Sequence, residues 1–428
     1  MSTWDSYGHT PNKIANGDTA DVTNDMFHRY PEDIQIMKQY GIHHYRFSIQ
    51  WNRILPTGEL KDGINEEGVK YYDDLINTLL ENGVEPHVTI YHGETPLPLA
   101  TYPHISMPFL DSENFPTWFA DYAEVLFQRF GDRVKQWFTF NEPFCIAAYG
   151  GVNSVDQYLM AHNILIAHGE TVSRYRSKYQ KKQIGGTIGI VLNTAHFYPA
   201  DPTSETDKAA AERGYDFWYG WFMDPLTKGE YPKSMRDTAG KALPIFTEEQ
   251  KKLIMGSLDF VAINYYFPYV TTAGTVSPSA PPTFDKDMNI TSYFAKEWPL
   301  SETGWGIYAT GLRDLLIYSS TKYPKVPLMI TENGLAWNET TRDQAINDVM
   351  RQQYLHDHVN AVGEAISVGC DVRGYFIWSF QDNLEWGSGF QMKFGIIWID
   401  RMNNLERVIK NSLRWYSQVL DYFYKSTI

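Results

Sequence analysis

The sequence predicts an α/β protein of the TIM (β/α)8-barrel type, in which seven strands are recognisable and the first β-strand is missing. Short apolar runs rich in β-branched and aromatic residues recur along the 428 residues, with helical segments between them. No glycine fingerprint of a dinucleotide-binding sheet follows the first run. Two of the runs end in a glutamate, at the position where a barrel of this type carries its active site.

The predicted strands have the composition of buried sheet. They are residues 43–49, 85–92, 136–143, 186–193, 258–266, 326–334 and 372–380. The segments between them show helical periodicity. In the predicted helix over 71–83, Tyr72, Leu75 and Leu79 share one face, and Gly83 suits the C-terminal cap. A strand followed by a helix, repeated this often, implies parallel strands joined by crossover helices.

A doubly wound open sheet is the main alternative to a barrel. It would need a glycine-rich turn leading from a strand into a helix, but "GGTIG" at 185–189 leads into a strand. The Pro- and Ser-rich segment 274–284 lies between a strand and a helix, so we expect a loop over one face of the fold. No linker divides the chain, and residues 1–428 are expected to form a single domain.

The charge balance argues against several classes of partner. Lys and Arg total 37 against 51 Asp and Glu, which gives a formal charge of −14. An acidic surface repels phosphate backbones and anionic lipid, so we expect no nucleic-acid and no membrane partner. The N-terminus has no signal-peptide pattern, which predicts a cytoplasmic protein. The oligomeric state is left open, with a homo-oligomer among the options. Cys145 and Cys370, the two cysteines, are expected to be free thiols.

Two predicted strands end in carboxylates. "QWFTFNEP" (136–143) delivers Glu142, and "VPLMITENG" (326–334) delivers Glu332. Either glutamate alone would be interpreted as a cap of the following helix. Two of them, each at a strand end and each beside an Asn, favour a paired-carboxylate site. Glycoside hydrolysis requires such a pair, because one carboxyl group donates a proton while the other attacks the anomeric carbon.

Other strand ends carry groups that suit this chemistry. Arg46 can hold a nucleophilic carboxylate in its anionic form, and His92, Asn264 and Tyr266 close two further runs. Alone, Arg46 would more often be part of a structural ion pair, and His92 a core histidine. Their convergence on one barrel mouth favours a substrate site. The chain has no HExxH-type spacing of metal ligands, so no metal and no cofactor is expected.

Four motifs in order make the sequence resemble glycoside hydrolase family 1, the β-glucosidase family, over nearly its whole length. They are "RFSIQWNRILPTG", "TFNEP", "ITENG" and "DNLEWGSGF". The resemblance implies a retaining β-glycosidase for β-D-glucosides, or for related β-galactosides and β-fucosides. It makes Glu142 the acid/base and Glu332 the nucleophile. The implied partners are small β-glycosides or oligosaccharides.

The same resemblance implies roles for further residues. Asn141 would contact the sugar 2-hydroxyl, Arg46 and Tyr266 would attend the nucleophile, and Trp305 would lie on the aglycone side. The implied substrate-binding residues are Arg46, His92, Asn141, Asn264, Tyr266, Trp305, Trp378, Glu385 and Trp386.

The sequence also differs from the family pattern. The family's opening strand, with its sugar-binding Gln, is absent, and Gly93 stands where the family has a Trp. We therefore expect an incomplete barrel with a gap between 43–49 and 372–380. The polar segment 1–25 is unsuited to a buried strand, so solvent or a partner should fill the gap. A second hypothesis follows: a catalytically weak or inactive homologue that binds sugars or acts as a partner subunit. No run ends in the Lys that an aldolase-like barrel would need, which argues against a third class.

Overall fold

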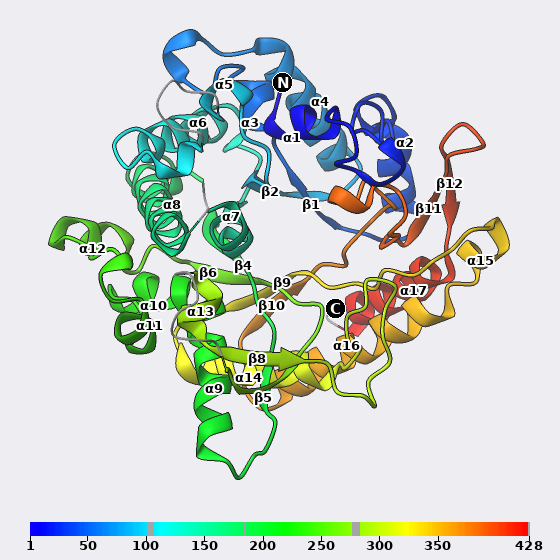
Figure 1. Cartoon of the computed structure of the whole chain (residues 1–428). Coiled ribbons are helices and arrows are strands. Elements are labelled where there is room, and N and C mark those ends of the chain that lie inside the picture. Colours follow the sequence, from blue (N-terminus) through cyan, green and yellow to red (C-terminus); the bar gives the residue numbers. More distant parts are fainter. Residues whose placement is uncertain (101–106, 152, 184, 276–282, 427–428) are drawn as a thin grey trace.

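The computed structural model describes residues 1–100, 107–151, 153–183, 185–275 and 283–426 (Figure 1). Its main feature is one curled sheet of seven parallel strands, in the order β1-β2-β3-β4-β6-β9-β10. The strands are β1 (His44–Ser48), β2 (Glu85–Tyr91), β3 (Gln136–Asn141), β4 (Thr187–Asn193), β6 (Phe260–Asn264), β9 (Leu328–Glu332) and β10 (Val372–Tyr375). This is the seven-stranded barrel sheet that the sequence predicts.

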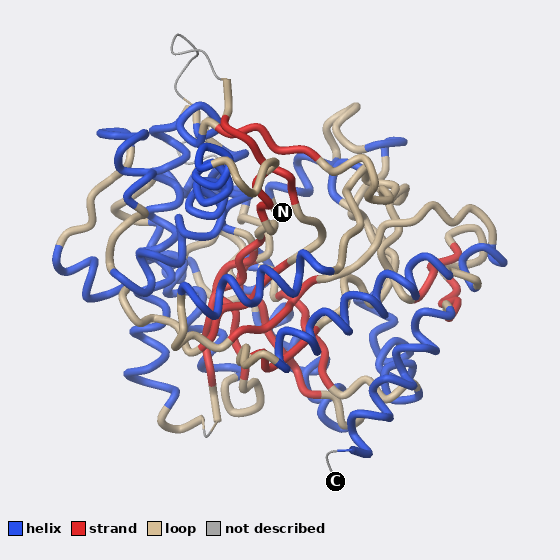
Figure 2. The backbone as a smooth tube through the Cα atoms, turned by 90° about the horizontal axis from the view of Figure 1, so that it is seen from below, coloured by secondary structure: helices blue, strands red, loops and turns tan. Residues whose placement is uncertain are grey.

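Helices surround the sheet, whose strands run through the middle of the molecule in Figure 2. The helices are α1 (Thr3–Gly8), α2 (Met26–Gln39), α3 (Trp51–Ile54), α4 (Glu66–Glu81), α5 (Leu97–Ala100), α6 (Phe115–Phe130), α7 (Pro143–Gly150), α8 (Ser154–Tyr175), α9 (Glu205–Tyr215), α10 (Trp221–Lys228), α11 (Lys233–Ala239), α12 (Glu248–Ile254), α13 (Phe284–Met288), α14 (Thr310–Lys322), α15 (Arg342–Ile346), α16 (Val349–Ser367) and α17 (Asn411–Ser426). Within this part of the chain, none is long and apolar enough to cross a membrane.

Among the described residues, five short strands lie outside the main sheet. They are β5 (Phe197–Pro199), β7 (Tyr269–Ala273) and β8 (Ile290–Tyr293) in one small sheet, and β11 (Ile397–Asp400) and β12 (Glu406–Ile409) in another. Of the expected loop 274–284, residues 276–282 lie outside the described residues.

Helix α4 shows how the apolar pattern works. Tyr72, Leu75 and Leu79 are buried, as their spacing predicts, and Gly83 ends the helix with φ at 73°. The helix begins at Glu66, earlier than the predicted span 71–83, because Glu66 and the residue after it place negative charge in the first turn, where the helix dipole favours it.

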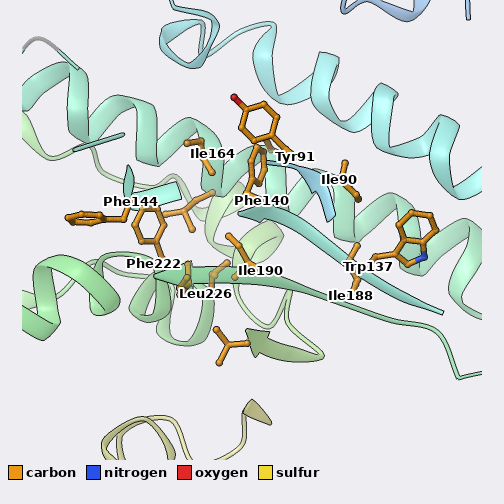
Figure 3. Close-up of a cluster of buried hydrophobic side chains, with 14 of the residues drawn as sticks. Ile90, Tyr91, Trp137, Phe140, Phe144, Ile164, Ile188, Ile190, Phe222 and Leu226 are labelled. Atoms are coloured by element: carbon orange, nitrogen blue, oxygen red, sulfur yellow. The ribbon is translucent and has the colours of Figure 1, made fainter. Parts of the chain in front are cut away.

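Both faces of the sheet are buried along its interior strands, of which β6 and β9 are buried at every residue. Outside the barrel, side chains from β2, β3 and β4 pack against helices, among them Tyr91, Trp137 and Ile190 (Figure 3). Inside the barrel lies a separate buried cluster that includes Phe138 and Phe260. A parallel sheet covered on both faces explains why the strands read as continuous apolar runs instead of alternating with polar residues.

The last strand is shorter than predicted. β10 ends at Tyr375, and its pairing with β9 shifts register after Val372. The predicted span 372–380 was too long because this strand has a sheet neighbour on only one side, so fewer ladder hydrogen bonds hold it extended.

The predicted gap is present between β1 and β10. In the described part of the chain, β1 pairs only with β2, and β10 pairs only with β9. A cavity of about 580 Å³ lies along both strands. The N-terminal segment borders this cavity through Trp4, Ala20 and neighbouring residues, but within residues 1–25 it adds no strand to the main sheet. The sheet therefore stays open along one line.

Candidate active site

The two glutamates lie at the carboxyl ends of β9 and β3. Glu332 is the last residue of β9, and Glu142 directly follows β3. Glu142 has a left-handed backbone, with φ at 51°, and its N–H donates to the carbonyl of Val191 in β4. This conformation is strained for any residue other than glycine, and strained residues of this kind are concentrated at functional sites. Pro143 then opens α7 and turns the chain away from the barrel.

Three side chains hold the carboxylate of Glu332. Nη1 of Arg46 donates to Oε1 at 3.0 Å, the Tyr266 hydroxyl donates to Oε2 at 2.8 Å, and Nε2 of His92 lies 3.4 Å from Oε1. Burial by itself raises the pKa of Glu332, but the hydrogen bond from His92 and the charge of Arg46 outweigh it. The net result is a lowered pKa, so Glu332 is an anion at neutral pH.

Glu142 has the opposite electrostatic environment. Nδ2 of Asn264 donates to its Oε1 at 2.8 Å, and the thiol of Cys145 donates to its Oε2 at 3.3 Å. Burial and the negative charge of Glu332 together raise the pKa of Glu142. No cation forms an ion pair with Glu142 among the described residues. The two carboxyl groups are thus set apart in proton affinity, the pattern of an acid and a nucleophile.

An amide network connects the two glutamates. Oδ1 of Asn141 accepts from Nη2 of Arg46 at 2.6 Å and from Nδ2 of Asn264 at 3.1 Å. The hydroxyl of Thr331 donates to Oδ1 of Asn264 at 2.8 Å, which fixes the orientation of that amide. The positions of the glutamates are therefore coupled through side chains from four strands, β1, β3, β6 and β9.

Aromatic rings line one side of the site. The ring of His92 is nearly parallel to those of Trp378 and Trp386, with centroids 5.8 Å and 6.1 Å away. Trp305 lies against Tyr266, with centroids 5.2 Å apart. Flat rings of this kind suit the faces of sugar rings.

Glu385 is a third carboxyl group near the site. Burial and the charge of Glu332 raise its pKa to about 8. At neutral pH it is therefore mostly protonated, and it can both donate and accept hydrogen bonds. The described residues contain no group of three or more His, Cys, Asp or Glu arranged to hold a metal ion.

Comparison with known proteins establishes the family. The model of glycosyl hydrolase family 1 matches residues 1–422. The chain belongs to glycosyl hydrolase family 1. Among similar curated proteins, furcatin hydrolase from Viburnum furcatum is 40% identical over 442 residues, covering 98% of this chain and 81% of that protein. Beta-glucosidase 12 from Oryza sativa subsp. japonica is 40% identical over 455 residues, covering 98% of this chain and 87% of the rice protein.

Solved family 1 structures share the fold. Rice Os3BGlu6 β-glucosidase superposes with a TM-score of 0.93 at 35% identity, covering 97% of this chain and 92% of the rice chain. β-glucosidase 2 from the fungus Trichoderma reesei, solved with Tris, has a TM-score of 0.93 at 33% identity, covering 99% of this chain and 93% of the fungal chain.

In this family 1 chain the space beside Gly93 is filled from elsewhere. A Cβ atom at this position would lie 2.9 Å from Cη2 of Trp386 and 3.8 Å from Nε1 of Trp4. The backbone there has φ at +101°, which disfavours any residue but glycine. Trp4 packs on Trp386 with ring centroids 4.6 Å apart. The indole of Trp4, from α1, thus lies near Gly93, the position at which the family pattern has a tryptophan.

Sequence reasoning missed two residues of this family 1 site. The sequence predicts Cys145 only as a free thiol, yet its thiol contacts Glu142. The signal was its place three residues after Glu142, on the first turn of α7. Trp4 was missed because it lies in a polar segment with no strand pattern. In the structure, each predicted substrate-binding residue interacts with one of the two glutamates or with a residue that contacts one of them. These residues are Arg46, His92, Asn141, Asn264, Tyr266, Trp305, Trp378, Glu385 and Trp386.

Proposed function

We propose that this chain hydrolyses β-D-glucosides or closely related β-glycosides with retention of anomeric configuration. The observation that carries the proposal is the opposite electrostatic setting of its two glutamates. Glu332 is bonded by Arg46 and Tyr266, which stabilise its anion, whereas burial and the nearby anion favour the protonated form of Glu142. The names of the similar curated proteins, among them a beta-glucosidase from rice, support the same substrate class.

In the first step, a carboxylate oxygen of Glu332 attacks the anomeric carbon as the bond to the aglycone oxygen breaks. Glu142 gives its proton to that oxygen, so the aglycone leaves as a neutral alcohol. The products of this step are a glycosyl ester on Glu332 and an ionised Glu142. The loss of the negative charge on Glu332 lowers the pKa of Glu142. Glu142 therefore stays ionised and can act as the base in the second step.

In the second step, a water molecule attacks the anomeric carbon from the side that the aglycone has left. The Glu142 carboxylate accepts a proton from this water, and the ester bond to Glu332 breaks. Both carboxyl groups return to their starting states. Two inversions at one carbon give net retention.

The substrate roles of the surrounding residues are part of the proposal. The side-chain oxygen of Asn141 accepts from Arg46 and Asn264, which leaves its amide N–H groups to donate to the 2-hydroxyl of the glycone. Trp378 supports the glycone ring, and Trp305 lies toward the aglycone. His92, Glu385 and Trp386 supply the polar groups that contact the hydroxyls of the glycone.

Turnover of an aryl β-glucoside by the purified chain tests this proposal. Glu332→Ala should remove most of the turnover, and Glu142→Ala should do so for an aryl glucoside with a poor leaving group. Glu249→Ala, at an exposed glutamate of α12, should leave it unchanged. Retention requires that proton NMR detect the β-anomer of the sugar first. It also requires carboxyl groups about 5–5.5 Å apart, whereas an inverting enzyme would separate them by about 6.5–9.5 Å. Release of the α-anomer first would contradict the mechanism.

A second candidate function is a weak or inactive family member that binds sugars or serves as a partner subunit. The open line between β1 and β10 favours it, because Arg46 and the segment leading to Trp378 lie on the two unpaired edges. The two candidates separate in kcat/KM. A value near 10⁴ M⁻¹s⁻¹ or above for a β-glucoside, the range of efficient enzymes, would exclude the second candidate.

A further inference from the structure

A long loop between β10 and β11 carries three of the residues that the proposed function assigns to the substrate. We call residues 378–395 the Trp386 loop, and it contains Trp378, Glu385 and Trp386. Its backbone pairs one end of the loop with the other, since the N–H of Ser379 donates to the carbonyl of Phe394 at 3.2 Å. These bonds hold the loop to itself. Its position relative to the two glutamates must come from contacts with other segments.

Two buried cations bind the two ends of the Trp386 loop. Nζ of Lys410, directly after β12, donates to Oδ1 of Asp382 near the start of the loop at 3.1 Å. Nη2 of Arg351, in α16, donates to the carbonyl of Lys393 near its end at 2.7 Å. The side chains of both cations are 0% exposed. Asp382 also links the two ends, because the same Oδ1 accepts from the N–H of Gly395 at 2.8 Å.

Glu339 joins the two cations to the segment that follows the proposed nucleophile. Its buried carboxylate pairs with both Arg351 and Lys410. Glu339 lies seven residues after Glu332 in the chain. In the same segment, the carbonyl of Leu335 accepts from Nε of Arg351 at 3.3 Å. The network therefore connects the segment after Glu332 with both ends of the Trp386 loop.

Stability alone does not explain a network of this kind. Removal of charges from water costs free energy, and an apolar replacement of a whole buried ion cluster is often neutral or stabilising. A buried polar network whose members are bonded to one another does hold them in one arrangement. Here the carboxylates of Glu339, Asp348 and Asp382 meet the two cations Arg351 and Lys410. The arrangement that this network fixes is that of the Trp386 loop.

We propose that Lys410 is a positioning residue of the substrate site, which sets the place of Glu385 and Trp386 relative to Glu332. The ammonium group of Lys410 bonds to Glu339 and Asp382, so it acts through these carboxylates and not on the substrate itself. Asp382 lies three residues before Glu385, which gives a short path from Lys410 to the sugar-binding residues. This inference rests on the proposed function, because it assumes that Glu385 and Trp386 bind the glycone.

Loss of this anchor should affect substrate binding more than the chemical step. Glu332 is held by Arg46 and Tyr266. Glu142 accepts a hydrogen bond from Asn264. Since these bonds do not involve the network, both limbs of the pH–rate profile should stay where they are. A displaced Trp386 loop weakens its contacts with the glycone in the ground state and the transition state alike, which raises KM and changes kcat less.

Two variants of the full chain separate positioning from stability. Lys410→Met keeps an unbranched side chain but cannot bond to Asp382, and it leaves the network with one more uncompensated negative charge. Lys410→Met/Glu339→Gln removes one negative charge together with the positive one, so Tm should recover toward that of the parent chain. In both variants KM for an aryl β-glucoside should rise about tenfold or more, with a smaller change in kcat and unmoved pH limbs. A purely structural role of Lys410 would make KM recover together with Tm.

Hydrogen exchange followed by mass spectrometry measures the Trp386 loop without any assay of activity. In both variants the amides of residues 383–392 should exchange about tenfold faster or more than in the parent chain, whereas those of β3 should not change. The matched control is Leu226→Ala, at a buried residue of α10 in the core outside the barrel (Figure 3). It should lower Tm through the cavity that it leaves, while KM and exchange of the loop stay at the parent values.

Four outcomes would overturn the proposal. They are recovery of KM together with Tm in the double variant, exchange of the loop at the parent rate, a loss that falls on kcat with a moved pH limb, and failure of both variants to fold. The last would make the network a requirement of folding alone. Faster exchange of the loop without turnover in any form of the chain, the parent included, would retain the anchoring and contradict the proposed function.

Discussion

Nη1 of Arg46 lies 3.0 Å from Oε1 of Glu332, although the two residues are 286 positions apart in the chain. Both side chains are almost fully buried, with 6% and 5% of their surfaces exposed. A charge pair removed from water in this way is costly to break, because the remaining charge is left without its partner. The position of Arg46 on β1 therefore affects the ionisation of Glu332, the proposed nucleophile.

Replacement of Arg46 should damage catalysis in a recognisable way. Arg46→Ala removes the cation that stabilises ionised Glu332, so kcat/KM should fall about a hundredfold or more, equivalent to about 3 kcal/mol. The pKa of Glu332 should rise, and the acid limb of the pH–rate profile should move to higher pH. Arg46→Lys keeps the charge and should recover part of the loss. An unchanged acid limb in Arg46→Ala would contradict this role of Arg46.

The nucleophile can be tested by chemical replacement. Glu332→Gly removes the attacking carboxylate and leaves space next to the anomeric carbon. Added azide should restore part of the turnover of an activated aryl β-glucoside and form a glycosyl azide, because the anion attacks in place of the side chain. Glu249→Gly with azide serves as the control for effects of the salt. Product analysis that finds no glycosyl azide would remove the nucleophile role from Glu332.

The acid role of Glu142 depends on the leaving group. In Glu142→Ala, substrates with poor leaving groups should lose activity by about 10²–10⁴-fold, the usual contribution of general acid catalysis, because their aglycone oxygen needs a proton to depart. Substrates with good leaving groups, such as dinitrophenyl glucosides, should lose far less in the first step. Steady-state and burst kinetics of the two substrate types measure the difference. Equal losses on both would assign Glu142 another role.

The pH dependence should be bell-shaped, with limbs that belong to the coupled pair of glutamates. Activity requires ionised Glu332, whose pKa is lowered, so it appears as pH rises through that value. It also requires protonated Glu142, whose pKa is raised by burial and by Glu332, so it is lost as pH rises further. The thiol of Cys145 opposes this shift by donating to Glu142. Cys145→Ala should therefore move the alkaline limb to higher pH, whereas Cys370→Ala should leave it unchanged.

A buried ion network away from Glu142 and Glu332 should make a large contribution to the free energy of unfolding. Arg351 is fully buried, pairs with Glu339 and donates to Asp348 at 2.8 Å. Arg351→Ala would leave two buried carboxylates with less compensation, so the free energy of unfolding should fall by about 3–5 kcal/mol. The exposed pair of Arg373 and Asp371 is the control, and Arg373→Ala should change stability by less than about 1 kcal/mol. Urea unfolding measures both, and equal effects would contradict the argument.

Several features of this protein follow from the sequence alone. Continuous apolar runs predicted parallel strands, and the described residues form seven of them in one sheet. The two strand-end glutamates were identified as a pair because parallel strands bring their carboxyl ends to one mouth. Counting the runs gave seven strands, the number that the described residues form, whereas the expected place of the gap came from the resemblance to the family pattern. The count of strands and the pairing of the glutamates use local composition and chain order, which the sequence contains directly.

Other features depended on the tertiary structure. The left-handed backbone of Glu142 and its contact with Cys145 arise from the way α7 leaves the barrel. Trp4 reaches the site because α1 is held beside Thr95, a contact that depends on distant parts of the chain. The opposed proton affinities of the two glutamates come from burial and from charges brought together by folding. Sequence order specifies which groups are present, whereas distances and burial, which set their energies, exist only in the folded chain.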